Sequence, residues 1–420
     1  MEDRSQLRAL VDQARKGGAR ACEVLRSQSE ERVMTAWRGR PQRSEVTTYT
    51  VRAWLDGGRG GVGRGPSGDK AVGDALLAAA AAEPSAVAGP ADRMPAVTGP
   101  LGIDDRRHAG IAEADRNEVL QTAERALARG DVALHRIEYR ERREVRAYLS
   151  TREVELEAGA TSYSLEAEAS LAGRTLGHRI ASRHFSDIAS LPFGTDLRRR
   201  LESLVPPGPV PSRALPVVLD PRAMAALVRG IAPAFAATAI ERSFLAAFRG
   251  KALASPALHL TDDAGLASGL RTCTFDDRGV PPIAVALLKE GVVNSLYHDP
   301  ESARARGLRP TGHCGPDGLA PANLVVRPGS RTRNVILTEL KDYVVVDELP
   351  PVDLATGRIQ GVVDALLVAG GQQVAGFRAL IETEVHTLLH QVSELAADQE
   401  RSEEVDAPTT VFEGLALLQG

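Results

Sequence analysis

Two histidines spaced four residues apart are the clearest metal-binding signal in the sequence. On a helix, His386 and His390 would share one face, which is the ligand spacing of a zinc-binding helix. Thr387 follows the first histidine, where such a helix usually carries the glutamate that activates water. Two interpretations stay open: zinc ligands, completed by Cys314 or Glu384, or a partly solvated helix face, which the missing glutamate favours.

Two other groups of polar residues occur in predicted turns. His313 and Cys314 are adjacent in the turn 311–316, and such a pair can bind a metal or lower the pKa of the thiol. Paired carboxylates at 262–263 and 276–277 offer oxygen ligands to a divalent cation. Local turn roles are favoured for all of them, because aspartate in a turn bonds the neighbouring backbone and glycine supplies a positive φ.

The segment 58–63 matches the glycine pattern GxGxxG, which in dinucleotide-binding proteins joins a strand to a helix. That helix must begin at the last glycine, so that its N–H groups meet the pyrophosphate. Here residues 64–67 intervene. The pattern therefore predicts a flexible hairpin turn rather than a cofactor site. The sequence also contains neither a phosphate-binding P-loop nor the G-x-S-x-G elbow of serine hydrolases.

Composition narrows the class of protein. The chain has 420 residues, with 43% hydrophobic and 25% charged, which is typical of globular proteins. Its net charge is 51 − 55 = −4 and its aromatic content is 4%, which argues against nucleic-acid binding. Three scattered cysteines fit a reducing compartment. With no apolar leader expected near the N-terminus and no stretch approaching roughly 20 apolar residues, we predict a cytoplasmic protein without membrane contact.

Periodicity predicts an N-terminal sheet flanked by helices. Apolar residues at helical spacing indicate the helices, and alternating segments indicate antiparallel strands with one solvated face. The expected helices are 3–18, 70–82, 113–129 and 186–204, the last interrupted by Pro192. The expected strands are 22–28, 31–37, 46–55, 132–139, 144–150, 153–157 and 162–171.

Four prolines within 206–211 mark the best domain boundary, because proline fixes φ and stiffens a spacer. A buried strand at 215–219 follows, then a helix over 221–237 that begins with Asp220 as its N-cap. Short strands and a late helix over 380–397 complete the expectation. The prediction is an α+β protein with an N-terminal domain, 1–205, and a mixed, mostly β domain, 206–420.

An ordered series of segments resembles the TldD/PmbA family. The C-terminal half carries most of the resemblance, and 17–23 and 51–60 match more loosely. The carrying segments are 216–221 (PVVLDP), 259–263 (HLTDD), 275–281 (FDDRGVP), 288–293 (LKEGVV), 311–312 (TG) and 323–329 (NLVVRPG). Within them, His313 stands where the family usually has Asn, and Arg278 where it usually has an acidic residue.

The resemblance also implies which kind of subunit this is. The TldD type carries His-Glu-x-x-x-His on the helix after the opening strand, and these residues with a later Cys form a zinc site. In this chain, 220–240 contains no His, Glu or Cys, and the motif would fall near 229–234 (RGIAPA). The chain therefore resembles the PmbA/TldE type, which lacks zinc.

That type is expected to be a non-catalytic subunit of a heterodimeric metallopeptidase. The resemblance implies a TldD-like partner that holds the zinc, no cofactor on this chain, and an extended small or unfolded peptide as substrate. A homodimer is the expectation if the partner is absent. The residues carried over as substrate-binding are Asp277, Gly279, Thr311, Gly312 and Asn323.

Two alternatives stay open at the level of sequence. One is an active metallopeptidase with a relocated zinc site, built from His386, His390 and Cys314. The other is a non-enzymatic regulator that binds another protein, since members of the family have been linked to modulation of DNA gyrase. The sequence has no basic stripe, so direct DNA binding is disfavoured.

Overall fold

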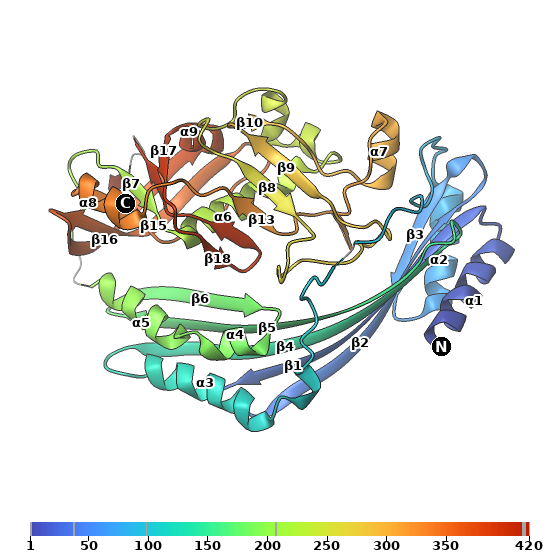
Figure 1. The fold of residues 1–420 in the computed structure, drawn as a ribbon, viewed down its shortest axis with the longest axis horizontal. Coiled ribbons are helices and arrows are strands. Elements are labelled where there is room, and N and C mark those ends of the chain that lie inside the picture. The colour runs from blue at the N-terminus through green and yellow to red at the C-terminus, as the bar shows by residue number, and fades with distance from the viewer. Residues whose placement is uncertain (1, 37, 98, 206–207, 414–416, 420) are drawn as a thin grey trace.

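The structure, a computed structural model, describes residues 2–36, 38–97, 99–205, 208–413 and 417–419. The N-terminal half forms one long, curved sheet with helices on its outer side (Figure 1). The C-terminal half contains further sheets and lies over the inner, concave side (Figure 1). The predicted α+β class is confirmed. Residue 37 of one predicted strand, and 206–207 of the predicted boundary, lie outside the described residues.

The N-terminal sheet has six antiparallel strands in the order β3-β2-β1-β4-β5-β6. Its strands are longer than predicted: 132–139 and 144–150, for example, join into the single strand β4. The charged residues between these segments resemble a turn in the sequence, but they pair across strands, as Arg142 does opposite Glu31. The strands are β1 (Ala21–Thr35), β2 (Arg38–Trp54), β3 (Gly60–Gly65), β4 (Ala133–Ser150), β5 (Glu155–Leu171) and β6 (Arg174–Ser182).

Five helices cover the convex side of this sheet, and all four predicted helical regions are confirmed. Leu7 and Leu10 of the first helix pack with Val24 and Val51 of the sheet in one apolar cluster. The second helix packs in the same cluster, and a second cluster lies under the last three helices around Tyr139 of β4. The helices are α1 (Glu2–Lys16), α2 (Gly68–Ala81), α3 (Glu113–Leu127), α4 (Phe185–Ser190) and α5 (Phe193–Ser203).

The glycine pattern at 58–63 does not form the predicted flexible turn, because most of it lies in the edge strand β3. A Cβ atom on Gly61 would come within 2.2 Å of the Ala75 carbonyl oxygen. A Cβ atom on Gly63 would come within 2.0 Å of the Ala71 carbonyl oxygen. The glycines therefore allow α2 to lie directly against the sheet.

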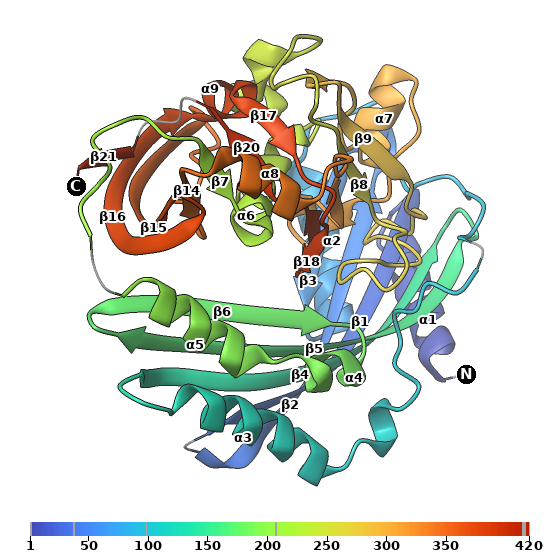
Figure 2. The ribbon, with the colours of Figure 1, turned by 60° about the vertical axis from the view of Figure 1, so that its left-hand side comes forward.

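The C-terminal half contains a seven-stranded sheet and a six-stranded sheet that share one apolar core. The first has the order β17-β20-β7-β14-β15-β16-β21, with β7 and β14 parallel. Its strands are β7 (Val217–Leu219), β14 (Tyr343–Val346), β15 (Arg358–Ala369), β16 (Gln372–Glu384), β17 (Val392–Leu395), β20 (Thr410–Phe412) and β21 (Leu417–Gln419). Figure 2 shows β15 and β16 curving around this half.

The six-stranded sheet has the order β10-β9-β8-β13-β19-β18, with β13 and β19 parallel. Its strands are β8 (Leu260–Asp263), β9 (Ala284–Lys289), β10 (Val292–Val293), β13 (Leu324–Val326), β18 (Glu400–Ser402) and β19 (Val405–Ala407). A small hairpin lies beside it, formed by β11 (Cys314–Gly315) and β12 (Gly318–Leu319). The helices α7 (Pro300–Arg306) and α8 (Arg333–Leu340) lie in the connections.

The helix predicted over 221–237 begins as expected and ends early. It is α6 (Pro221–Ile231), and the Asp220 carboxylate caps it by accepting the N–H groups of Arg222 at 2.9 Å and Ala223 at 3.2 Å. A 3₁₀ turn, Ala232–Phe235, follows and contains Pro233. Proline lacks the N–H that a continuing α-helix needs, which explains the early end.

The predicted helix over 380–397 is wrong. This region contains the end of β16, a six-residue helix α9 (Val385–His390), and β17. The spacing of its apolar residues fits a helix as well as a strand, and hydrogen-bonded pairing with β15 makes 380–384 a strand. No helix among the described residues is long and apolar enough to cross a membrane.

Candidate functional site

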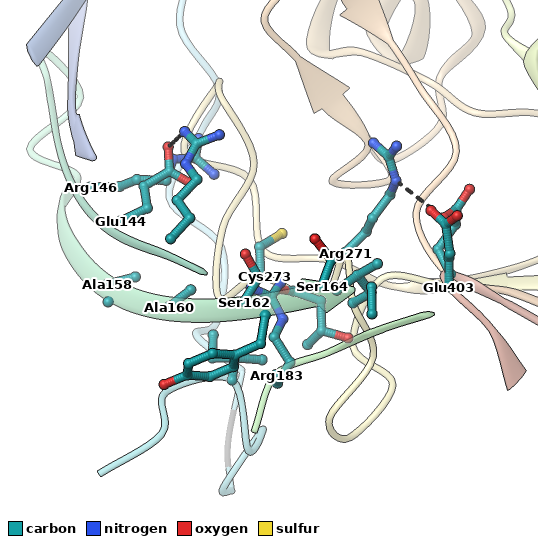
Figure 3. Close-up of a pocket in the computed structure, with 18 of the residues that line it drawn as sticks. Glu144, Arg146, Ala158, Ala160, Ser162, Ser164, Arg183, Arg271, Cys273 and Glu403 are labelled. Carbon is teal, nitrogen blue, oxygen red and sulfur yellow. Dashed lines mark hydrogen bonds and ion pairs between the residues drawn. The ribbon is translucent and has the colours of Figure 1, made fainter. Parts of the chain in front are cut away.

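A groove separates the concave face of the N-terminal sheet from the C-terminal half. It consists of two adjoining cavities of about 510 and 500 Å³. Both are lined by three charged residues of β4, Arg142, Glu144 and Arg146, and by Arg271 and Cys273 from the facing loop. Figure 3 shows Cys273 and Arg271 opposite the small residues of β5. We call this space the central groove.

The floor of the central groove is a β-sheet surface. Successive side chains of a strand point to opposite faces, so every second residue of the sheet faces the groove. The floor side chains contributed by β1, β2 and β5 are mainly small, and most of the small ones are polar: Ser27, Ser29, Thr48, Thr50, Ala158, Ala160, Ser162 and Ser164. Leu25, Val46 and Glu31 of these strands also line the cavities. Small residues leave the floor open to an extended chain lying across it.

The predicted residue Asn323 holds the loop that closes the groove. Its side-chain N–H₂ donates to the Asp263 carbonyl and to Thr272 Oγ1, both at 2.9 Å. Its amide oxygen accepts the N–H of Arg271 at 3.0 Å. Asn323 is buried, so it positions the loop from behind and does not itself line the groove.

Arg183, just after β6, hydrogen-bonds the same loop from the N-terminal half. Its guanidinium donates to the carbonyl oxygens of Gly269 at 3.1 Å and Thr272 at 2.9 Å, and to that of Thr161 in β5 at 3.0 Å. Burial lowers the pKa of Arg183 to about 10. No local pattern marks this residue in the sequence, because its partners are backbone carbonyls far away in the chain.

One carboxylate of each pair bonds its own turn, as the favoured interpretation expects, whereas Asp262 and Asp277 have partners elsewhere. Asp276 Oδ1 accepts the N–H groups of Arg278 at 2.8 Å and Val280 at 2.9 Å. Its other oxygen accepts the N–H of Cys314 at 2.9 Å. Asp263 Oδ1 accepts the Gly265 N–H at 2.9 Å.

Arg278 joins the two halves of the chain. Its Nε lies 2.5 Å from Glu23 of β1, and its terminal nitrogens lie 2.7 and 2.9 Å from Glu301 of α7. The guanidinium also lies over Trp54, with its Cζ 5.5 Å from the centroid of the ring. Tyr148 donates to Glu23 at 3.0 Å. We call Arg278, Glu23, Glu301 and Tyr148 the buried joint; its only sequence signal was the basic residue at Arg278.

Two of the predicted substrate residues lie at this joint. Asp277 forms an ion pair with Arg146 of β4, and its carbonyl accepts a hydrogen bond from Arg52 at 3.0 Å. Gly279 has φ +68°, and a Cβ atom there would lie 2.3 Å from the Tyr148 ring. Asp277 also lines the groove, so its predicted substrate role stays a prediction.

The predicted turn at 311–314 forms the opposite rim. Thr311 Oγ1 accepts the N–H of His298 at 3.1 Å, and Gly312, with φ +73°, passes close to the backbone of Pro281. His313 is buried, with Nδ1 2.9 Å from the Thr311 carbonyl. Burial raises the pKa of the Cys314 thiol, which keeps it in the unreactive protonated form.

The candidate histidine ligands lie at the surface of the C-terminal half. His386 and His390 stand at opposite ends of the short α9, where His390 is exposed. His386 Nδ1 lies 3.2 Å from Glu384, and its ring lies 5.3 Å from that of Phe248. Within the part of the chain that the structure describes, no three His, Cys, Asp or Glu residues are placed to hold a metal ion.

The helix at which the resemblance would place zinc does not fit the metal. Helix α6 and the following 3₁₀ turn contain no His, Glu or Cys. Their inward side chains are apolar and belong to the large core. Arg229, the first residue of the expected register, pairs with Glu404 at 2.7 Å. This region therefore packs as core and offers zinc no donor set.

Comparison with known proteins places the C-terminal half of the chain in a family. Residues 212–418 match the PmbA/TldA metallopeptidase C-terminal domain. The C-terminal half of the chain is therefore a domain of the PmbA/TldD family, as the sequence resemblance predicted. Among curated proteins, none matches this sequence significantly.

Three solved structures share the fold along nearly the whole chain. A proposed DNA gyrase modulator from Bacteroides thetaiotaomicron has a TM-score of 0.86 at 19% identity, covering 99% of each chain. One from Thermotoga maritima has a TM-score of 0.84 at 19% identity, covering 97% of each chain. TldE from Thermococcus kodakarensis has a TM-score of 0.84 at 18% identity, covering 98% of this chain and 99% of its own. At such identity these likenesses establish the fold alone.

Proposed function

We propose that this chain is the non-catalytic, TldE-type subunit of a heterodimeric zinc metallopeptidase. A TldD-like partner would hold the zinc and cut small, unfolded peptides. The proposal rests on α6 and its 3₁₀ turn, whose inward side chains are apolar and include no zinc ligand. They lie in a chain whose C-terminal domain belongs to a metallopeptidase family. The free thiols Cys22, Cys273 and Cys314 support a cytoplasmic location.

A non-catalytic subunit can still bind and orient the peptide, and the central groove is the place for it. Its two cavities, about 510 and 500 Å³, lie over a sheet floor of small polar residues. The hydroxyls of Ser27, Ser29 and Thr48 can hydrogen-bond the backbone of an extended peptide that lies across this floor, and such small side chains leave room for those of the peptide. This chain would therefore orient the peptide, and Arg183 and Asn323 would keep the facing loop in place.

The test is reconstitution with the TldD-like chain from the same genome. We expect the two chains to co-purify and the pair, loaded with zinc, to cleave an unfolded peptide, whereas this chain alone is inactive with or without added zinc. A matched control is the pair with the first zinc histidine of the partner changed to Ala, which should assemble and not cleave. Zinc-dependent cleavage by this chain alone would overturn the proposal.

The names of two structural relatives favour a second candidate, a non-enzymatic regulator of another protein. Those two proteins are described as proposed modulators of DNA gyrase. Affinity purification from cell extract separates the candidates. Recovery of a TldD-like chain supports the subunit proposal, whereas recovery of gyrase subunits or of a homodimer without any TldD-like chain supports the regulator.

A further inference from the structure

The accessible charge of the central groove is carried by arginine. Three guanidinium side chains in the cavity nearer β1 and β2 are strongly exposed: Arg64 at 46%, Arg142 at 46% and Arg271 at 58%. They come from β3, β4 and the facing loop, so they surround the cavity from both halves of the chain. We call them the groove arginines.

The carboxylates of the same cavity already have hydrogen-bond or ion-pair partners within the protein. Asp276 is 3% exposed and accepts backbone N–H groups within its own turn. Asp277 is paired with Arg146, which removes both charges from the accessible surface. Glu144 accepts Ser27 Oγ at 2.5 Å as well as Arg142 at 3.3 Å. The acidic groups offset part of the positive charge, but each already has a partner in the protein, and the three guanidiniums are the most exposed charged groups of this cavity.

Two of the three groove arginines, Arg64 and Arg271, form only long ion pairs. Arg64 lies 3.7 Å from Asp317, a side chain that is 99% exposed. Arg271 lies 4.0 Å from Glu404, whose other oxygen is held by Arg229 at 2.7 Å. Exposed pairs at such distances contribute little, so a ligand carboxylate can replace them at low cost.

The groove favours a peptide over a nucleic acid. Single-stranded nucleic acids need exposed aromatic faces on which the bases stack. The aromatic rings at this groove are buried, with Tyr163 at 1% and Phe275 at 2% exposure. An extended peptide needs instead a sheet floor, which Ser27, Ser29 and Thr48 provide.

We propose that the central groove selects peptides with acidic side chains, whose carboxylates are bound by Arg64, Arg142 and Arg271. The inference rests on the proposed function, because it assigns a specificity to the same peptide groove. A guanidinium binds a carboxylate through two parallel N–H···O bonds, which fixes both the position and the charge of the ligand. Neutral peptides would keep the hydrogen bonds to the floor hydroxyls and would lack the carboxylate–guanidinium bonds.

The test is peptide binding to the purified full chain, measured by fluorescence anisotropy. The probes are an unfolded peptide with four glutamates and the same peptide with Gln or Lys in their place. We expect the Glu peptide to bind about tenfold or more tightly than the Gln peptide, and its affinity to fall as salt is raised. Equal binding of the Glu and Gln peptides overturns the inference, as does tighter binding of an oligonucleotide.

Matched variants locate the effect. Arg142→Gln and Arg271→Gln should each lower affinity for the Glu peptide several-fold and leave the Gln peptide unchanged. The control is Arg199→Gln on α5, an arginine 75% exposed on the convex side, which should change neither. A loss that is equal for both peptides, or equal in the control, contradicts the assignment.

Cys273 provides a readout that does not depend on any variant. It lines both cavities, whereas Cys314, 7% exposed, lines one of them and Cys22 is fully buried. Burial raises the pKa of the Cys273 thiol to about 12, so alkylation is slow and is followed at mildly alkaline pH. The Glu peptide should slow it further, and unchanged alkylation at saturating peptide places the peptide elsewhere. Co-purification with the TldD-like partner is measured separately, so failure of this inference leaves the subunit proposal standing.

Discussion

The buried joint and the central groove use the same residue type in opposite ways. Arg278 has a side chain only 8% exposed, and it has carboxylate partners in both halves. Arg142 and Arg271 are 46% and 58% exposed, and each has one carboxylate partner, Glu144 at 3.3 Å and Glu404 at 4.0 Å. An arginine with every donor occupied stabilises the fold, whereas an arginine facing solvent stays available for a ligand. The difference separates the structural part of the interface between the halves from the part that can bind.

The largest expected effect is the loss of Arg278. Arg278→Ala leaves Glu23, which is 1% exposed, without its principal counter-charge. Removing one partner of a buried ion pair costs about 3–5 kcal/mol of unfolding free energy. Urea unfolding measures the loss. Arg20→Ala, which removes an exposed pair with Asp56, is the control and should match the unchanged chain. Equal stability of the two variants would show that the joint does not hold the halves together.

A somewhat smaller effect is expected for Gly279→Ala. The new methyl would meet the Tyr148 ring, and φ +68° strains any residue other than glycine. Such strain costs about 1–3 kcal/mol, and the clash adds to it. The matched control is Gly307→Ala, with φ +65° and open space around its Cβ position. The account requires Gly279→Ala to be clearly the less stable of the two.

Acidification should weaken the interface at a second place, beside His178 of β6. Burial and the nearby Arg200 and Arg222 lower its pKa to about 3, from about 6.5 when unfolded. The neutral ring is therefore favoured in the fold, and its contribution is present at neutral pH and lost as pH falls below about 6.5.

Between about pH 7 and about pH 5 the loss should be about 2 kcal/mol. Urea unfolding at both pH values measures it. His178→Gln should reduce the pH dependence by that amount, whereas His135→Gln, at an exposed histidine bonded to Ser170, should leave it unchanged. A pH dependence that survives His178→Gln assigns the effect to another group.

The smallest stability effect is expected at the groove. Arg142→Gln and Arg271→Gln remove exposed, weakly paired charges, so unfolding free energies should stay within about 0.5 kcal/mol of the unchanged chain. The same variants should weaken binding of the Glu peptide. Large destabilisation by either variant would mean that the groove arginines are structural, and the comparison with the buried joint would fail.

The sequence predicted local features better than distant ones. The N-terminal helices and the Asp220 cap were readable, because each depends on neighbouring residues. Strand lengths were underestimated where charged residues such as Arg142 are satisfied across the sheet rather than locally. The prediction of a helix over 380–397 was wrong because pairing with β15, and not the spacing of apolar residues, decides the structure of 380–384.

The candidate site shows the same limit. Asp276 was recognised as a turn residue, whereas Gly279 and Asn323 were singled out for substrate binding and not for their places at the buried joint and behind the loop. Glu23 and Arg183 went unnoticed, because their partners lie far away in the chain. A groove formed between two halves has no local pattern, so only the three-dimensional arrangement reveals which arginines face it.

In its proposed role, this chain supplies a peptide groove and binds no zinc of its own. The most direct test is elemental analysis of zinc in the purified chain alone, after dialysis without chelator. The account predicts zinc well below one ion per chain. A value close to one zinc per chain, lost in His386→Ala or His390→Ala, would contradict it and make the relocated metal site the better explanation.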